Sequence, residues 1–278
     1  MVVNVDSQRT GGLPGPLGPF GADASPSFFD LLRRTAPAAV PAMLRGDPVR
    51  PELLDSLVEG TTVLALTFPN GVIIAGDRRA TAGNFIARRD MRKVFPADRH
   101  SAVAISGAAG PAVEMARVFA TELEHYEKVE GEQLSLEGKA NKLAFMVRAN
   151  MPLAMQGIVV VPLFAGYDIR AQRPSIFEYD PIGGRYESLD HAATGSGSIF
   201  ARGTLKKGHQ AVTDVDSGAL LAVQALFDAA EEDSATGGPD RIRDQYPILA
   251  VIDADGYREL VRDAVVELVD HVIAARTE

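Results

Sequence analysis

The chain has 278 residues, of which 46% are hydrophobic, and a formal net charge of −9 at pH 7. This length and apolar content can bury the core of one large domain or of two smaller ones. The acidic balance argues against a nucleic-acid-binding surface, which needs clustered Lys and Arg. Cysteine is absent, which excludes a disulfide framework, a thiolate metal site and a cysteine nucleophile, and fits a reducing compartment.

No secretion, membrane or metal signal is apparent. The N-terminus lacks a basic region followed by an apolar run. The most apolar segment, residues 158–166, is less than half as long as the ~20 residues that a membrane helix needs. The histidines show no paired spacing that would suggest metal ligands. We therefore expect a cytoplasmic protein with no membrane contact, no metal and no cofactor.

Residues 1–60 differ in composition from the rest of the chain. Gly and Pro dominate residues 11–21, which is typical of an unpacked tail. A short amphipathic helix is predicted over residues 27–35, and prolines then oppose regular structure. This segment has two interpretations: a disordered extension, or a removable propeptide whose last residue is Gly60.

From Thr61 onward the pattern becomes that of β-structure. Strands are predicted over residues 61–68, 72–75, 93–95 and 101–106. Asn70-Gly71 is a strong hairpin signal between the first two strands. The second pair is expected to turn through residues 96–98.

Blocks of helices and strands then alternate to the C-terminus. Apolar faces predict helices over residues 111–129, 135–151 with Ser135 as N-cap, 216–232 and 261–275, and residues 193–198 are expected to open a helix ending near Lys207. Strands are predicted over residues 157–168, 175–179, 184–189 and 248–253. Helices gathered in pairs between strand blocks favour layered sheets with helices outside over a strictly alternating doubly wound fold.

The Gly60-Thr61 bond has the composition of a bond that can break itself. Glycine leaves its carbonyl carbon uncrowded, so the hydroxyl of Thr61 could attack it. Cleavage would leave Thr61 at a new chain terminus, with a nucleophile and an amine base in one residue. The alternative is that Thr61 and Thr62 occur here only because β-branched residues suit strands.

Six short motifs follow one another along the chain, and in this order they resemble a proteasome β subunit of the actinobacterial type. They are Gly60-Thr61-Thr62, Gly76-Asp77-Arg78-Arg79, Lys93, Gly107, Thr194-Gly195-Ser196-Gly197-Ser198 and Asp233-Ser234-Ala235-Thr236-Gly237-Gly238. The resemblance covers the chain from Gly60 onward. It implies an α+β fold, a four-layer αββα sandwich of the N-terminal-nucleophile hydrolase class over residues 61–278, and removal of residues 1–60 by autocleavage.

The resemblance also implies a threonine endopeptidase. Thr61 would attack the scissile carbonyl while its freed amine takes the proton, and such an amine titrates near neutrality, at roughly 7.7–8.0. Lys93 would lie beside Thr61, where its charge favours a neutral amine, and Asp77 would hold it there. Without the resemblance, Lys93 would be interpreted as a surface lysine and Asp77 as a turn residue.

Four further residues receive roles by resemblance. Ser196, Asp233 and Thr236 would form a hydrogen-bonded support around the amine of Thr61. Many members of the family have Ser where Thr236 stands, and Thr retains the hydroxyl. The N–H of Gly107 would donate to the oxyanion. The residues alone also allow helix caps, with Ser196 and Ser198 at an N-terminus and Asp233 and Gly237 near a C-terminus.

Substrate binding in this family is by β-addition, which the resemblance places near Thr81, Gly107 and Ala109. The pocket for the residue before the cut would be lined by apolar side chains, so we expect cleavage after hydrophobic residues. Those side chains are Ala80, Met91, Ile105, Ala109 and Val113.

The resemblance implies assembly as well. Two seven-membered rings of this chain would stack between rings of proteasome α subunits, giving a 28-subunit core that degrades unfolded proteins with a regulatory ring ATPase. Three alternatives remain open at this point. They are a bacterial threonine protease with six-membered rings, an inactive structural β-type subunit, and a monomeric amidase with an N-terminal nucleophile.

Overall fold

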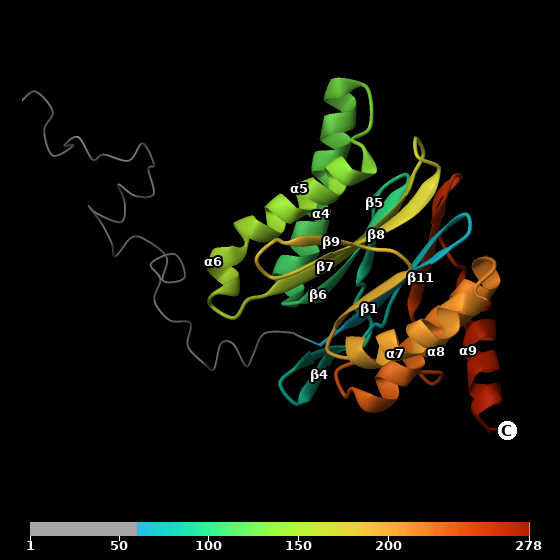
Figure 1. The fold of residues 1–278 in the computed structure, drawn as a ribbon. Coiled ribbons are helices and arrows are strands. Elements are labelled where there is room, and N and C mark those ends of the chain that lie inside the picture. The colour runs from blue at the N-terminus through green and yellow to red at the C-terminus, as the bar shows by residue number, and fades with distance from the viewer. Residues whose placement is uncertain (1–59, 278) are drawn as a thin grey trace, which may run out of the picture. The chain divides into compact units, whose positions relative to one another are not determined.

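The structure is a computed structural model that describes residues 60–277. In this range two sheets are stacked face to face, and helices cover both outer faces (Figure 1). The four layers confirm the predicted αββα sandwich and its α+β class. The predicted Gly/Pro tail, the helix over residues 27–35 and the proposed propeptide up to residue 59 lie outside the described residues.

The first sheet contains β1, the strand that begins within the Gly60-Thr61-Thr62 motif. Its strand order is β10-β1-β2-β11-β12, and every neighbouring pair is antiparallel. The start of β1 lies beside the ends of both its neighbours, because Thr62 pairs with Gly195 and Val63 pairs with Gly76. The strands are β1 (Thr62–Phe68), β2 (Gly71–Gly76), β10 (His191–Gly195), β11 (Ile248–Asp253) and β12 (Gly256–Glu259).

The second sheet carries Gly107 at the end of one of its strands. Its order is β5-β6-β7-β8-β9, again antiparallel throughout, and Gly107 pairs with Val160. A separate hairpin of two short strands follows β2. The strands are β3 (Ala80–Ala82), β4 (Phe85–Arg88), β5 (Val94–Asp98), β6 (Ser101–Gly107), β7 (Val160–Asp168), β8 (Arg173–Tyr179) and β9 (Arg185–Ser188).

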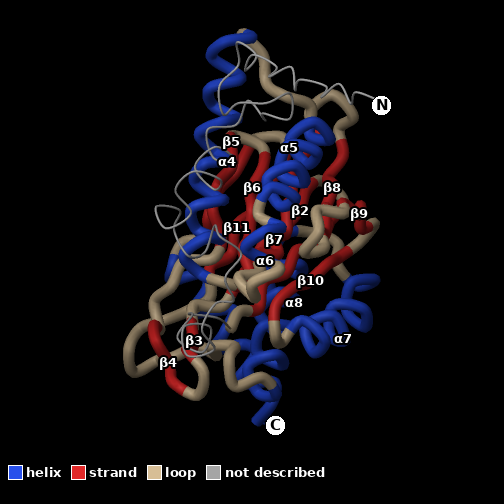
Figure 2. The backbone as a smooth tube through the Cα atoms, turned by 90° about the vertical axis from the view of Figure 1, so that its left-hand side faces the viewer, coloured by secondary structure: helices blue, strands red, loops and turns tan. Residues whose placement is uncertain are grey.

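Helices form the two outer layers. The second sheet is covered by α4 (Ala109–Glu130) and α5 (Leu136–Ala149), followed by the short α6 (Met151–Ala154); Figure 2 looks onto this layer. The first sheet is covered by α7 (Ser198–Gly208), the 3-10 turn η2 (His209–Ala211), α8 (Val215–Glu232) and α9 (Arg262–Thr277). No helix in residues 60–277 is both long and apolar enough to cross a lipid bilayer.

Burial on both faces explains why the central strands read as continuous apolar runs. Side chains of Val63, Ile74 and Leu163 are fully buried between the sheets, while Leu64 and Ile73 on the alternate positions pack under the helices of the first sheet. A strand in a stacked layer has no solvent face, so the alternation typical of an exposed sheet is lost.

The element predictions hold for most of the described chain. Ser135 is the N-cap of α5, and its hydroxyl accepts a hydrogen bond from the N–H of Gly138 at 3.1 Å. The turn predicted at residues 96–98 is wrong: β5 continues to Asp98, and the turn lies at residues 99–100. The strand tolerates Pro96 because β5 is the edge of its sheet, where a missing N–H breaks no ladder.

Strand β10 is a second correction. The sequence predicts that residues 193–198 open a helix, yet His191–Gly195 is a strand and α7 begins only at Ser198. The small residues of this stretch carry little strand preference of their own, and pairing with β1 supplies the missing stabilisation. Strands β3, β4 and β12 also went unpredicted, each being only three or four residues long.

A histidine pair at the far end of β10 gives a pH-dependent expectation. The ring of His191 lies 5.7 Å from that of His209. Burial lowers the pKa of His191, and the charge of His209 lowers it further, while Asp190 opposes the shift. A depressed histidine pKa means that the unfolded chain binds the proton more readily, so stability should fall as the pH drops below about 6.5.

This expectation is tested by following the thermal midpoint from pH 7.5 to pH 5.5. The substitution His191→Gln should flatten the loss seen in the unmodified chain. Equal slopes for the two proteins would show that His191 is not the titrating group.

Candidate active site

Segments that are far apart in the sequence meet where β1 begins. Thr61 immediately precedes β1, Asp77 follows β2, and Lys93 precedes β5. The loops after β10 and α8 close the site from the other side with Ser196, Asp233 and Thr236. The structure thus brings together six of the seven residues predicted for catalysis through one continuous set of hydrogen bonds.

Thr61 is held tightly at the head of β1. It is only 5% exposed, and its hydroxyl donates to the carbonyl oxygen of Gly60 at 2.6 Å. Its own carbonyl accepts from the N–H of Ser196 at 2.9 Å, and its N–H donates to the hydroxyl of Ser196 at 3.4 Å. The backbone and the hydroxyl of Ser196, which follows β10, therefore hold Thr61 in place.

Gly60 can only be glycine in this conformation. Its φ of +96° lies in a region that other residues rarely adopt. A Cβ atom at this position would stand 2.3 Å from the hydroxyl oxygen of Thr81 and 2.8 Å from the Cβ of Ala235. At the predicted cleavage junction there is therefore no space for a side chain on residue 60.

Lys93 and Asp77 form a fully buried ion pair beside this junction. The Nζ of Lys93 lies 2.5 Å from Oδ1 of Asp77, and both side chains are 0% exposed. The same Nζ donates to the carbonyl oxygen of Gly60 at 3.2 Å. Lys93 therefore faces Thr61's peptide bond, and the surface-lysine interpretation is wrong for this residue.

Asp77 satisfies its buried charge with backbone donors as well. Its Oδ1 accepts from the N–H of Thr62 at 2.9 Å. Its Oδ2 accepts from the N–H groups of Arg79 and Gly237 at 2.9 and 2.8 Å. A buried carboxylate is stable only when it is paired and hydrogen-bonded in this way, so Asp77 links β1, β2 and the loop after α8.

Burial lowers the pKa of Lys93 from its ordinary value, and Arg79 lowers it further, whereas Asp77 and Asp233 raise it. The lysine thus gives up a proton more readily than a solvated one would, while the carboxylate keeps it oriented. The lowered pKa suits a group that exchanges a proton next to a reacting hydroxyl, and the carboxylate of Asp77 fixes its direction.

Ser196, Asp233 and Thr236 form a compact hydroxyl–carboxylate group next to Thr61. Oδ2 of Asp233 accepts hydrogen bonds from the hydroxyls of Ser196 and Thr236, both at 2.6 Å. The cap interpretation holds for Asp233, which is the C-cap of α8. It is wrong for the serines, because the N-cap of α7 is Gly197 and no side chain caps that helix.

Gly107 ends β6 with a φ of +91°, and a Cβ there would lie 2.2 Å from the carbonyl oxygen of Val159. The backbone again requires glycine. The role of Gly107, at the end of β6, as oxyanion donor stays a prediction that comes from the family resemblance.

A groove of about 730 Å³ opens beside these strands. Three of the five predicted pocket residues, Met91, Ala109 and Val113, line it together with Phe95 and a rim of charged side chains. The other two, Ala80 and Ile105, are 1% and 2% exposed and do not line it. Thr81 is half-buried in β3. The groove is large enough to take a side chain of an extended peptide.

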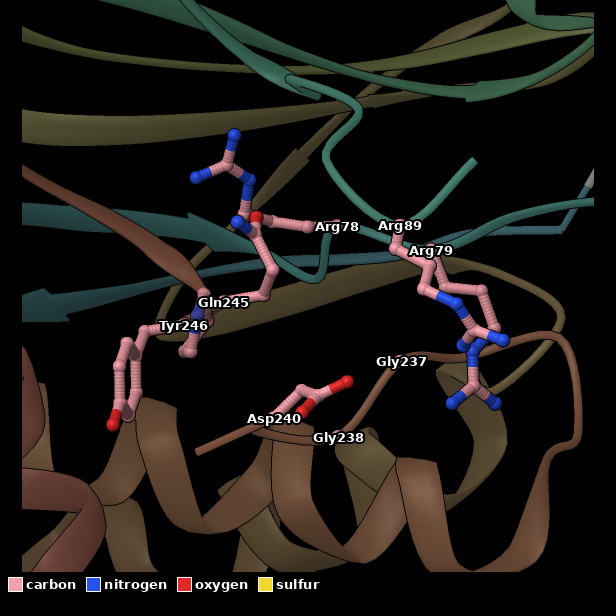
Figure 3. A pocket seen from close by; sticks show the side chains of 9 residues that line it. Arg78, Arg79, Arg89, Gly237, Gly238, Asp240, Gln245 and Tyr246 are labelled. Atoms are coloured by element: carbon pink, nitrogen blue, oxygen red, sulfur yellow. The ribbon is translucent and has the colours of Figure 1, made fainter. Parts of the chain in front are cut away.

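A second hollow lies between Arg78 and Arg79 after β2 and the residues that follow Gly237 (Figure 3). The side chains of Arg79 and Arg89 point toward the backbone of Gly237, and the carboxylate of Asp240 faces the same gap. Its volume of about 20 Å³ admits little more than one water molecule. This hollow has no room for a peptide. In the described residues no cluster of His, Asp or Glu is placed to hold a metal ion.

Two residues for which the motifs predict no role, Gly195 and Thr62, belong to the site. A Cβ on Gly195, whose φ is +100°, would lie 2.0 Å from the carbonyl oxygen of Thr61. Thr62 is fully buried and hydrogen-bonded to Thr236. The small residues from 194 to 198 indicate that another segment of backbone packs closely against them. Only the pairing of β10 with β1 shows that this segment is the one at Thr61 and Thr62.

Two antiparallel sheets between helical layers define the fold class of the N-terminal-nucleophile hydrolases. Comparison with known proteins then identifies the family. The model of the proteasome subunit family matches residues 57–243. The chain therefore belongs to the proteasome subunit family, a family of proteases whose members assemble into a multi-subunit core.

Several actinobacterial relatives support this assignment over most of the chain. A proteasome subunit beta from Streptomyces griseus subsp. griseus is 50% identical over 278 residues, covering 99% of this chain and 96% of the relative. One from Acidothermus cellulolyticus is 51% identical, covering 96% and 95%. One from Acidimicrobium ferrooxidans is 56% identical over 238 residues, covering 86% and 85%.

Proposed function

We propose that this chain is a threonine endopeptidase subunit of a proteasome core, with Thr61 as the nucleophile after cleavage of the Gly60-Thr61 bond. The observation that carries the proposal is the buried Lys93–Asp77 pair, whose Nζ lies 3.2 Å from the carbonyl oxygen of Gly60. A lysine without solvent access, directed at one peptide bond, has a chemical rather than a solubilising role.

Self-cleavage would use the groups already in place. The hydroxyl oxygen of Thr61 attacks the carbonyl carbon of Gly60, and Lys93 stabilises the negative charge that develops on the carbonyl oxygen. The C–N bond then breaks as the nitrogen of Thr61 takes up a proton, leaving an ester between Gly60 and the Thr61 oxygen. Water hydrolyses this ester, which gives a carboxylate on Gly60 and a free hydroxyl and amine on Thr61.

Peptide hydrolysis would repeat this chemistry on a substrate. The hydroxyl of Thr61 attacks the scissile carbonyl while its proton passes to the Thr61 amine. The N–H of Gly107 donates to the oxyanion. The amine then protonates the departing peptide nitrogen as the C–N bond breaks, and a water activated by the same amine hydrolyses the acyl ester. Ser196 and Asp233 hold the amine in place.

N-terminal sequencing tests the proposal most directly. Co-expression with an α-type subunit should give a chain that begins at Thr61. A full-length chain in fully assembled particles would instead favour an inactive structural subunit. Electron micrographs of the same particles should show seven subunits per ring, and six would favour the simpler bacterial threonine protease.

The groove beside the site would select a hydrophobic residue before the cut. Met91, Ala109 and Val113 supply apolar surface there, against which an acidic side chain would lose its hydration. Of the arginines in the lining, Arg88 and Arg92 are already paired with Asp90 and Glu259. We expect kcat/KM for a fluorogenic peptide with Leu at that position to exceed that of its Glu counterpart by roughly 10- to 100-fold.

The substitution Met91→Lys should narrow this ratio, because the new ammonium can pair with the glutamate. Met155→Lys is the matched control, since Met155 is 83% exposed at the end of α6 and lines no part of the groove. A preference for Glu in the unmodified particles would contradict the assignment of the groove.

In the assembled particle, we infer that rings of this chain stack between α-type rings, with the threonines facing an enclosed chamber. Confinement would then restrict substrates to unfolded chains, which a regulatory ring ATPase delivers. The masking of the Thr61 amine by the preceding peptide bond would delay activity until the chamber is complete.

A further inference from the structure

The second threonine of the Gly-Thr-Thr motif has no part in the chemistry described so far, yet it is fully buried and its hydroxyl is used twice. The N–H of Gly197 donates to Oγ1 of Thr62 at 3.0 Å. The same oxygen lies 2.6 Å from Oγ1 of Thr236. A strand residue chosen only for its branched side chain would need neither contact.

The direction of these hydrogen bonds follows from counting protons. The hydroxyl of Thr236 donates to Oδ2 of Asp233 at 2.6 Å, and it has no second proton to give. The hydroxyl of Thr62 must therefore donate to Thr236. The chain runs in one direction, from the N–H of Gly197 through Thr62 and Thr236 to the carboxylate of Asp233.

A second branch of hydrogen bonds reaches the same carboxylate from the nitrogen of Thr61 through Ser196. The single hydroxyl proton of Ser196 has two acceptors in reach, Oδ2 of Asp233 at 2.6 Å and the carbonyl oxygen of Thr61 at 3.3 Å. The shorter contact to the charged carboxylate is the stronger one, so we assign the proton to it. The oxygen of Ser196 is thereby left with lone pairs for the N–H of Thr61, which lies 3.4 Å away. The two branches meet at Oδ2 of Asp233, so the branch from Thr62 through Thr236 helps to fix the carboxylate that orients Ser196.

Glycine at position 197 is what allows the chain to close. A Cβ there would stand 2.5 Å from Oγ1 of Thr62 and 2.7 Å from Oγ1 of Thr236. The start of α7, strand β1 and the loop after α8 are therefore in contact at one point, and the hydroxyl of Thr62 lies at that point.

We propose that Thr62 is a positioning residue for the hydrolysis reaction, which orients the Thr236–Asp233–Ser196 group toward the nitrogen of Thr61. The proposal rests on the proposed function, because it gives that nitrogen the role of proton acceptor. Thr62 touches neither substrate nor the reacting atoms and acts only through its neighbours.

The substitution Thr62→Val separates the hydroxyl from the strand-forming side chain, since valine keeps the shape and the β-branch. In assembled particles we expect kcat for a fluorogenic peptide to fall roughly tenfold with KM unchanged, the loss of about one buried hydrogen bond in the transition state. Thr62→Ser, which restores the hydroxyl, should recover most of the lost rate.

Thr67→Val is the matched control, because Thr67 lies on the same strand at the opposite end and its hydroxyl donates to the carbonyl oxygen of Asp190. Its kcat should equal that of the unmodified particle. If Thr62→Val does not assemble, Thr62→Ala removes the same hydroxyl with a smaller side chain, and the same fall in kcat relative to Thr62→Ser is expected from it.

Three results would overturn the proposal. They are an unchanged kcat in Thr62→Val, a Thr62→Ser variant as slow as Thr62→Val, and an equal effect of the Thr67 control. None of these touches the role of Thr61, which is tested separately by removing its own hydroxyl. Activity that survives that removal would instead overturn the proposed function and leave Thr62 with a purely structural part.

Discussion

Replacing Thr61 with alanine is expected to abolish both cleavage of the precursor and hydrolysis of peptides. The hydroxyl of Thr61 lies 2.6 Å from the carbonyl oxygen of Gly60, so this substitution removes the proposed attacker itself. Peptidase activity should fall by a factor on the order of 10⁴ or more. Mass spectrometry of the intact chain and a fluorogenic peptide assay measure the two losses independently.

Thr61→Ser is the control for this experiment, because it keeps the hydroxyl and the amine. It should still be processed and should retain measurable turnover. A Thr61→Ala variant that matures and cleaves peptides at the normal rate would exclude Thr61 as nucleophile.

Replacing Lys93 with methionine should remove activity and also destabilise the fold. Asp77 would keep a buried charge without its partner, which typically costs ~3–5 kcal/mol. The two effects have different origins, so loss of activity by itself would not reveal a chemical role. Lys93→Arg should fail as well, since a 0% exposed site has no space for a larger planar guanidinium.

A second buried ion pair provides the comparison that separates the two effects. Lys139 on α5 lies 2.5 Å from Asp98 at the end of β5, with side chains 5% and 9% exposed. Lys139→Met should lower the denaturation midpoint by a similar amount while the folded, assembled particles retain their turnover. If both variants lose activity in proportion to stability, Lys93 is a structural residue.

Much of the fold could be predicted because the local signals and the tertiary structure agree. The run after Thr61 is apolar on both faces, as a strand between two layers must be. Asn70-Gly71 marks the β1–β2 turn, and Ser135 begins its helix with the expected cap. When the local sequence preference agrees with the tertiary contacts in this way, a helix or strand can be predicted from the sequence alone.

The failures fall where long-range pairing outweighs local preference. Strand β10 consists of residues with weak strand propensity, and its conformation is stabilised by pairing with β1, more than a hundred residues away in the chain. Pro96 reads as a turn residue, but an edge position removes its penalty. Neither the pairing of β10 nor the edge position of β5 can be inferred from the residues of the strand itself.

The candidate site shows the same division. Thr61, Asp77 and Lys93 could be named from the motif pattern, but nothing in the sequence places the lysine's Nζ next to the carbonyl of Gly60. Thr62 was noticed only as the neighbour of Thr61, since its hydroxyl partners come from loops after β10 and α8. Contacts between distant loops require coordinates.

The placement of Thr61 at the head of a strand flanked on both sides has a mechanical consequence. Thr62 is already paired with Gly195, and Val63 with Gly76, so severing the chain just ahead of them unravels no ladder. After cleavage, Thr61 would become a chain terminus at the end of a strand that is already paired on both sides. Activation would therefore require no rearrangement of the sheet.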